Sequence, residues 1–310
     1  MRVVLTAVVG LLLLSEFGIA APVPAAAAGQ PESRTIYVTA LDREGRPVTD
    51  LQAADFAVKV GNKPLDVIRS EPAKAPLRIA VVVADAGTGG FQQALGNFMQ
   101  KLLGHAEFSL ISVIVQPEVV VDYASEGAVL RDGLRRLGPR GRQAGAQLME
   151  AIREAAGTVR RDGRRPAILV LRVGGEAITP LSGNEVRDQL RRSGALLHVV
   201  STLGAQRTPA SSARPGISSE QAQMQDNDTA TSFLNLGQVL GDGARESGGR
   251  HDQVVSTTLV PALERVADEL LLQYAVTCVL PQSTKPTDRL SVSTTRKGVK
   301  LQTPARLPTP

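Results

Sequence analysis

Residues Leu77 to Gly90 read LRIAVVVADAGTGG, and this stretch decides the fold. It begins with a nearly continuous apolar, β-branched run, which is typical of a central parallel strand buried on both faces. The run ends at Asp85 in a glycine-rich segment, and Phe91 to Leu103 then has the spacing of an amphipathic helix. We therefore expect Asp85 to Gly90 to lie at the carboxyl end of a parallel sheet, where such sheets bind ligands.

The chain beyond this unit keeps alternating between buried strands and helices. The expected strands are 108–115, 118–123, 167–173 and 195–202, and the expected helices are 126–137, 147–161, 184–193 and 258–272. Right-handed crossovers between such elements give a doubly wound, mostly parallel sheet, so the predicted fold class is α/β. Residues 203–231 are rich in Ser, Ala, Gln, Pro and Asp, and we predict a flexible insertion there.

Shorter strands flank this α/β domain, which we place at residues 76–272. Residues 33–72 alternate as an N-terminal β segment, and residues 273–305 as a C-terminal one. The strands on either side are too few for an independent domain. We therefore expect the two terminal segments to form one additional small β domain. Cys278, the single cysteine, lies in an apolar run of this segment and is interpreted as a buried small hydrophobe.

Residues 1–28 have the features of a secretory signal peptide followed by a linker. One early positive charge precedes an apolar run of about a dozen residues, and small residues near Ala20 and Ala28 offer two cleavage positions. The run is too short to span a bilayer and is followed by Glu16. We expect an exported protein, periplasmic or extracellular, with no stable membrane anchor after signal removal.

The net charge of +5 is unevenly distributed. Between Arg131 and Arg165 there are ten arginines and four acids, a local charge of 10 − 4 = +6. No aromatic residue lies in this stretch, so the stacking platforms that bind single-stranded nucleic acid are missing. We expect no nucleic-acid partner and interpret the stretch as a solvated helical face, with an acidic partner or envelope surface as the alternative.

The order of elements resembles the von Willebrand factor A fold: a central strand, a helix, an antiparallel hairpin, then alternating helices and strands. Two flanking phrases are similar to those of the bacterial exported proteins called von Willebrand factor A-related. The first stands as Asp42, Gly45, Pro47, Val48, Leu51, Asp55 and Phe56, and the second as Gly248-Gly249-Arg250 followed by Gln273-Tyr274.

The resemblance implies a metal-ion-dependent adhesion site at the end of the first strand. Relatives with a working site carry Asp-x-Ser-x-Ser there, because a hard cation such as Mg²⁺ takes oxygen ligands. In this chain Asp85 fills the first position, but Gly87 and Gly89 replace both serines, and Thr88 is out of phase.

The remaining ligands that the resemblance implies are a Thr before a later helix and an Asp ending the next strand. Ala146, or the nearby Gly145, stands at the Thr position, and Val173 stands at the Asp position. Gly174 follows, and Glu176 lies three residues late. We therefore expect a degenerate site that binds no metal and no cofactor. The candidate binding residues of this face are Asp85, Gly87, Thr88, Gly89, Ala146, Val173, Gly174 and Glu176.

Rival chemistries lack their motifs. A dinucleotide fingerprint needs a third glycine where residue 92 is Gln, and no G-x-S-x-G elbow exists. The three histidines, His105, His198 and His251, have no metal-ligand spacing. We interpret His198 as a satisfied core histidine, and Asp85 equally as a ligand or as a cap for the loop or following helix. No catalytic residue is expected, and a metal- or nucleotide-dependent enzyme is the least favoured reading.

The leading prediction is a non-catalytic protein-interaction module. It would bind a protein partner through the face around Asp85, residues 174–178 and the insertion at 203–231. The alternative is a structural or scaffold component of an envelope assembly, which would use the terminal β domain and the face from Arg131 to Arg165.

Overall fold

The computed structural model describes residues 32–85, 89–137, 146–174, 179–202, 219–281, 284–285 and 288–307. The expected signal peptide and linker, residues 1–28, lie outside these ranges. Among the residues that are described, no helix has both the length and the apolar character needed to cross a membrane.

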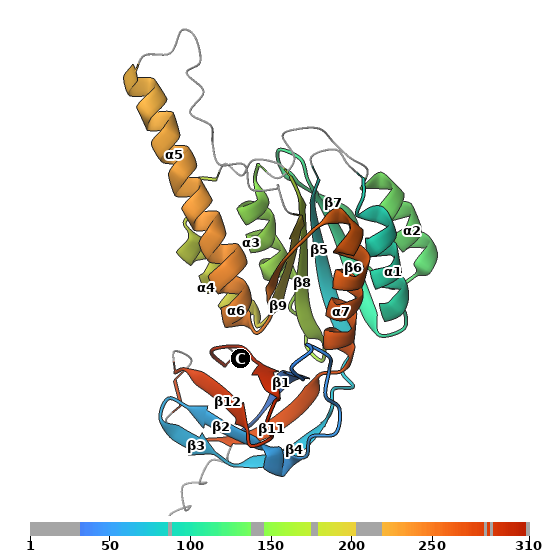
Figure 1. Cartoon of the computed structure of the whole chain (residues 1–310), viewed down its shortest axis with the longest axis vertical. Helices are drawn as coiled ribbons and strands as arrows, with labels where there is room; N and C mark the ends of the chain where they lie inside the picture. The colour runs from blue at the N-terminus through green and yellow to red at the C-terminus, as the bar shows by residue number, and fades with distance from the viewer. Residues whose placement is uncertain are drawn as a thin grey trace, which may run out of the picture. The chain divides into compact units, whose positions relative to one another are not determined.

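Six strands form the central sheet in the order β10-β9-β8-β5-β6-β7 (Figure 1). They are β5 (Leu77–Asp85), β6 (Ala106–Val113), β7 (Pro117–Ala124), β8 (Arg165–Val173), β9 (Leu196–Thr202) and β10 (His251–Val254). β7 pairs antiparallel with β6, whereas the other neighbouring strands pair in parallel. The prediction of a doubly wound, mostly parallel α/β sheet is confirmed.

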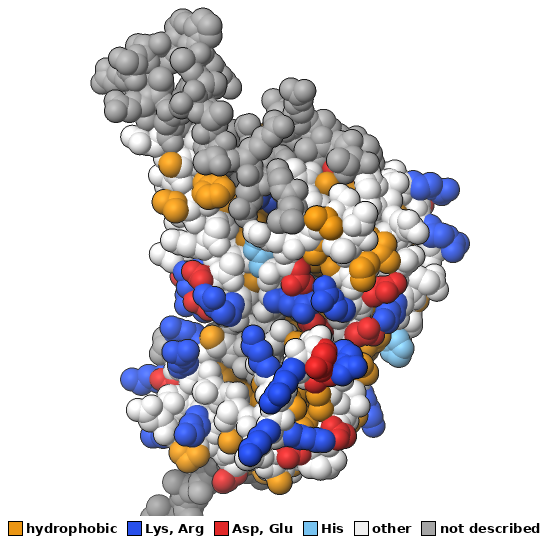
Figure 2. Space-filling model, viewed as in Figure 1, with side chains coloured by type: hydrophobic (Ala, Val, Ile, Leu, Met, Phe, Trp, Pro, Cys, Tyr) orange, Lys and Arg blue, Asp and Glu red, His pale blue; other side chains and the backbone are white. Residues whose placement is uncertain are grey.

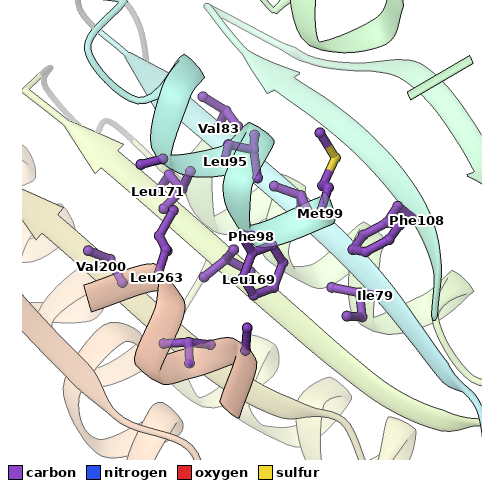
Figure 3. Close-up of a cluster of buried hydrophobic side chains, with 14 of the residues drawn as sticks. Ile79, Val83, Leu95, Phe98, Met99, Phe108, Leu169, Leu171, Val200 and Leu263 are labelled. Atoms are coloured by element: carbon purple, nitrogen blue, oxygen red, sulfur yellow. The ribbon is translucent and has the colours of Figure 1, made fainter. Parts of the chain in front are cut away.

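Helices cover both faces of this sheet, so the central strand β5 is buried on both sides. Its odd-numbered residues, such as Ile79 and Val81, pack into a cluster with α1 (Gln92–Leu102), α2 (Gly127–Arg136) and α7 (Leu259–Leu271). Figure 3 shows this cluster, in which the rings of Phe98 and Phe108 meet edge to face at 6.2 Å. Burial on two faces explains why the strand lacks the polar alternation of a surface strand.

The opposite face of the sheet carries a second hydrophobic cluster. Val82 and Ala84 of β5 pack there with α3 (Leu148–Thr158) and α4 (Gly183–Ser193). The cluster continues into a π-helical turn, η2 (Gln238–Gly243), and the short helix α6 (Ala244–Ser247). Two 3-10 turns, η1 (Ala53–Asp55) and η3 (Ser256–Thr258), are also present among the described residues.

The terminal segments form two small sheets that share one core. The first has the order β13-β1-β11-β4 and the second β12-β2-β3. Their strands are β1 (Glu32–Leu41), β2 (Phe56–Val60), β3 (Lys63–Leu65), β4 (Val67–Pro72), β11 (Tyr274–Leu280), β12 (Leu290–Thr294) and β13 (Lys300–Gln302). Cys278 is fully buried in this core, and burial raises the pKa of its thiol to about 11. The predicted additional β domain, built from both terminal segments, is therefore present.

The flexible insertion predicted at residues 203–231 is wrong from Ser219 onward. Helix α5 covers Ser219–Gly237, while residues 203–218 lie outside the described residues. Its N-terminal half has too few apolar residues to show a helical period, but Glu, Gln, Ala and Met all favour helix. The polar composition of this segment therefore suggested a loop, although the intrinsic helix propensity of its residues favoured a helix.

Arg165, the first residue of β8, joins the α/β part to the terminal β domain. Its guanidinium donates hydrogen bonds to the backbone oxygens of Ala75 (2.7 Å) and Leu270 (2.8 Å), and to Gln273 Oε1 (2.9 Å). Gln273 in turn donates to Thr39 Oγ1 of β1 at 3.3 Å. Burial lowers the pKa of Arg165 to about 10, so it remains charged at neutral pH. These bonds fix both connections between the two parts.

Candidate functional site

Asp85 lies at the carboxyl end of β5, where it is directly opposite Val173 in the parallel register with β8. Its side chain is nearly buried, with 5% of the residue exposed. The backbone N–H of Gly89 donates a 2.7 Å hydrogen bond to Asp85 Oδ2, whereas α1 begins at Gln92 without a side-chain cap. Asp85 therefore stabilises the loop and does not cap the helix. Stabilising the loop was one of the two structural roles considered for this residue.

The other described positions of the expected ligand set supply no side-chain oxygen. Val173 is buried in the hydrophobic cluster beneath α1 and α7, and Gly174 turns the chain out of the sheet with a φ of +78°. Ala146 precedes α3 and is partly exposed. Among the described residues, no three His, Cys, Asp or Glu side chains gather closely enough to hold a metal ion.

Three of the candidate binding residues are not placed by the structure. Gly87, Thr88 and Glu176 lie outside the described residues. The structure thus brings Asp85 together with Gly89 and Val173, and among the described positions that the resemblance implies for a metal site, Asp85 carries the one carboxylate.

A polar contact beside this face could not be found from the sequence. Thr179, in the segment between β8 and α4, donates to Glu150 Oε1 of α3 at 2.7 Å. Ser232 of α5 donates to the Thr179 backbone oxygen (3.2 Å) and accepts from its backbone N–H (3.4 Å). Helix α5 is therefore tied to the segments that end the sheet. Nothing in the spacing of these residues predicts the contact, because Ser232 follows Thr179 by 53 positions.

Next to Ser232, two large apolar side chains of α5 face solvent. Phe233 is 40% exposed and Leu234 is 66% exposed, whereas Leu236 is buried against α3 and α4. Figure 2 shows hydrophobic side chains on the outer side of α5. Exposed aromatic and large apolar residues are enriched on surfaces that bind other proteins.

A serine and a histidine also meet in the fold. Ser201 Oγ of β9 lies 2.8 Å from His251 Nε2 of β10, and burial lowers the pKa of this histidine. Ser201 is only 2% exposed, so a substrate could not reach its oxygen. The next acid, Asp252, is ion-paired with Arg250 (Nε to Oδ2, 2.9 Å) rather than with the histidine. The hydrogen bond between Ser201 and His251 therefore joins the edge strand β10 to β9.

Two more buried ionisable residues lie near Arg250, His198 of β9 and Glu269 of α7. Burial lowers the pKa of His198 to about 3, so it is neutral at physiological pH, and Arg250 adds to this effect. Its Nδ1 has no hydrogen-bond partner among the described residues, so the histidine is a core residue but is not fully satisfied. Burial raises the pKa of Glu269 to about 7, although Arg250 Nη1 lies 2.8 Å from its Oε1. His105, the third histidine, is exposed.

The order of elements identifies the fold of the α/β part. β5 and α1 are followed by the antiparallel β6–β7 pair, then by helices, β8, α4 and β9. This is the order that the resemblance predicted, so the α/β part is von Willebrand factor A-like.

No protein-family model matches the chain, and no curated protein matches it. Among solved structures, it is similar to a von Willebrand factor type A protein from Catenulispora acidiphila, with 10% identity, a TM-score of 0.45, and coverage of 82% of this chain and 73% of that one. It is also similar to the vWF domain of the type V pili tip protein Mfa5 from Porphyromonas gingivalis. The identity is 10% and the TM-score 0.40, and the match covers 64% of this chain and 96% of that one.

Another similar structure is proximal thread matrix protein 1 from the mussel byssus, at 10% identity and a TM-score of 0.43. The match covers 65% of this chain and 50% of that one. The chain thus spans about half the length of the mussel byssus structures that it matches.

Proposed function

We propose that this chain is an exported, non-catalytic protein-interaction module. It binds a protein partner through the face at the carboxyl ends of β5 and β8 together with the outer side of α5. The observation that carries the proposal is the adjacent pair Phe233 and Leu234, 40% and 66% exposed on a helix that Ser232 anchors. A helix that is held in place before binding loses little backbone conformational entropy when a partner binds, which favours affinity.

We also propose that no metal ion bridges the partner at this face. The Asp85 carboxylate already accepts the backbone N–H of Gly89, and neither Ala146 nor Val173 carries a side-chain oxygen. A hard divalent cation takes about six oxygen ligands, so one carboxylate would leave nearly all of them to water. Export is supported by the signal-like features of residues 1–28. The absence of catalysis is supported by the burial of Ser201, Glu269 and His198.

The test is crosslinking of the mature protein in its native envelope. We expect wild type to give a discrete crosslinked species and the double variant Phe233→Ser/Leu234→Ser to lose it. The matched control is Ile68→Ser, which removes an apolar side chain that is 58% exposed on β4 of the terminal β domain. This control should retain the crosslinked species.

A crosslinked species that survives in the α5 variant would contradict the proposal. If the same species disappeared in Ile68→Ser, the terminal β domain would be the contact surface. That result would support the alternative role as a structural component of an envelope assembly.

A further inference from the structure

Two neighbouring cavities lie at the opposite end of the sheet, where β8 and β9 begin. One has a volume of about 300 Å³ and the other about 350 Å³, and both are lined by Gly194 and Pro304. We call the two together the arginine groove, because nine arginines line it and no lysine does. The groove is lined by both the α/β part and the terminal β domain.

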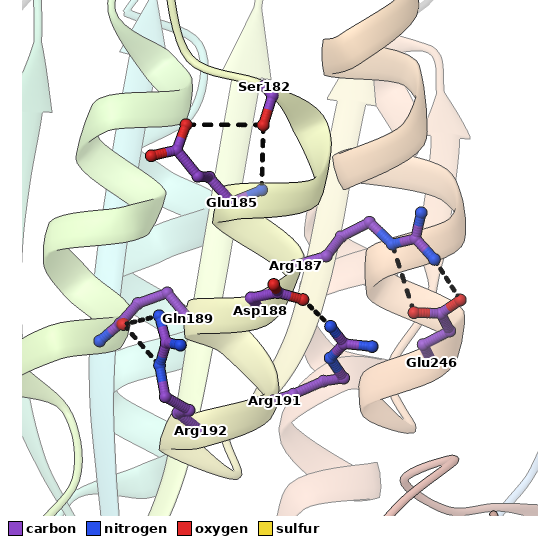
Figure 4. A network of polar contacts seen from close by, with 8 residues as sticks. All are labelled: Ser182, Glu185, Arg187, Asp188, Gln189, Arg191, Arg192 and Glu246. Atoms are coloured by element: carbon purple, nitrogen blue, oxygen red, sulfur yellow. Dashed lines mark hydrogen bonds and ion pairs between the residues drawn. The ribbon is translucent and has the colours of Figure 1, made fainter. Parts of the chain in front are cut away.

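The smaller cavity is lined by four arginines and one acid. Arg187 and Arg191 come from α4, and Arg289 and Arg306 come from the terminal β domain. The acid is Glu246, whose Oε1 lies 2.5 Å from Arg187 Nη2 (Figure 4). The charge of the lining is therefore 4 − 1 = +3, and Arg191 is also ion-paired with Asp188 of α4, which is not part of the lining (Figure 4). Burial lowers the pKa of Arg191, and the nearby Arg306 and Arg187 lower it further, as expected where like charges are gathered.

The larger cavity is more basic still. Its lining includes Arg34, Arg160, Arg161, Arg164 and Arg165, against the single acid Asp162, which gives a charge of 5 − 1 = +4. Some of these side chains also hold the structure together, since Arg165 bonds the junction and Arg160 donates to a backbone oxygen of α4 at 3.2 Å. The excess of positive charge is a property of the lining as a whole.

The chemistry of these linings selects the charge of the ligand. A guanidinium donates two parallel hydrogen bonds to an oxyanion, a geometry that the ammonium group of lysine does not offer. A phosphate group carries close to two negative charges and three acceptor oxygens, so it can take several guanidinium groups at once. A carboxylate carries one charge and would leave part of the positive charge around the smaller cavity uncompensated.

The size of the cavities selects the kind of ligand. Volumes of about 300 and 350 Å³ suit a small molecule or a headgroup rather than the surface of a folded protein. We propose that the arginine groove binds a phosphate-bearing ligand, with the phosphate groups in contact with Arg187, Arg191, Arg289 and Arg306. This site is separate from the protein-binding face at the carboxyl ends of the strands.

Calorimetric titration of the full chain with inorganic pyrophosphate, at about 0.15 M salt, tests the proposal because surface charges are largely screened there. We expect saturable binding. The double variant Arg191→Gln/Arg306→Gln should weaken it by about tenfold or more, since charge-assisted hydrogen bonds are lost. The control Arg135→Gln/Arg153→Gln removes the same net charge from exposed sites on α2 and α3 outside the groove, and should change the affinity by less than about twofold.

Further variants separate recognition from folding. Circular dichroism identifies any variant that does not fold, and if the double variant fails, the exposed Arg289→Gln replaces it. Arg289→Lys keeps the charge but loses the paired donors, so it should also weaken binding. No saturable binding by wild type, or an equal loss in the groove and control variants, would overturn the proposal.

Two more probes identify the chemistry and its source. A hexaglutamate peptide that bound more tightly than pyrophosphate would overturn phosphate as the ligand group. Vesicles of phosphatidylglycerol that bind and are displaced by pyrophosphate would show that the phosphate comes from a lipid headgroup. Pyrophosphate binding without vesicle binding would support a soluble phosphorylated ligand.

Discussion

At the scale of single residues, Asp85 has a structural role at the end of β5. Its carboxylate accepts a hydrogen bond from the Gly89 backbone, and its register partner Val173 is a core residue. One oxygen of this carboxylate is therefore hydrogen-bonded to the chain itself. The sequence could show that Ala146 and Val173 carry no side-chain oxygen, whereas the hydrogen bond from Gly89 to Asp85 depends on how the chain folds.

This arrangement predicts that divalent cations leave the stability unchanged. In a thermal-shift assay, Mg²⁺, Mn²⁺, Ca²⁺ or a chelator should not alter the Tm of the wild type. Asp85→Ala should lower stability by about 1 kcal/mol through loss of the Gly89 hydrogen bond, with or without metal. A saturable rise in Tm with metal that disappears in Asp85→Ala would contradict the expectation.

A second prediction concerns Glu269, whose pKa burial raises to about 7 from an ordinary 4.5. Between these values the folded chain keeps a proton that the unfolded chain has released. The free energy of unfolding should therefore fall as the pH rises from 4.5 to 7, by up to about 1.4 kcal/mol per pH unit. Glu269→Gln should remove this fall in urea unfolding at pH values across the range. Glu264→Gln, exposed on the same helix, should keep it.

At the scale of elements, the sequence predicted those whose apolar pattern is strong. The expected helix at 91–103 is α1 (Gln92–Leu102), and the expected strand at 167–173 is the larger part of β8. It missed β10 (His251–Val254), because HDQV has no strand pattern of its own. That strand exists through its parallel pairing with β9, which is a tertiary effect. The sequence also missed the start of α5. Its residues have high helix propensity, but its apolar residues show no helical period.

The approach of β10 to the sheet depends on a glycine. A Cβ at Gly249 would lie 2.1 Å from the Leu197 backbone oxygen, a clash that flexible side chains cannot relieve. We expect Gly249→Ala to lower the free energy of unfolding by at least about 2 kcal/mol, measured by urea unfolding. Gly237→Ala is the control. Its Cβ would meet nothing within 4 Å, and alanine favours helix, so stability should be unchanged or raised. A mild effect at Gly249 would mean that β10 can shift.

At the scale of the whole molecule, the α/β part and the terminal β domain are joined through buried polar groups. The two connecting segments meet at Arg165, which serves the backbone oxygens of Ala75 and Leu270 as well as Gln273. The sequence predicted the two parts from their patterns. It could not predict the junction or the groove beside it, because Arg165 looked like one more charge in an arginine-rich stretch.

This junction predicts cooperative unfolding. Arg165→Met leaves the half-buried oxygen of Ala75 and the buried oxygen of Leu270 without this donor, so we expect a loss of about 3 kcal/mol and separate transitions for the two parts. Urea unfolding followed by circular dichroism and by Tyr fluorescence measures both. Arg161→Met, at an exposed position of the same stretch, should preserve one transition. Coincident transitions in Arg165→Met would show that the parts are coupled by other contacts.

The pairing order of the terminal sheet has a consequence for how the chain is made. β11 lies between β1 and β4, yet Tyr274 follows Pro72 by 274 − 72 = 202 residues. On a growing or translocating chain, the first strands wait without their central partner while the α/β part forms. Chains cut short before β11 keep Ile36 and Val38 exposed, within reach of proteases and chaperones. The pairing of β11 with β1 and β4 thus distinguishes complete chains from truncated ones.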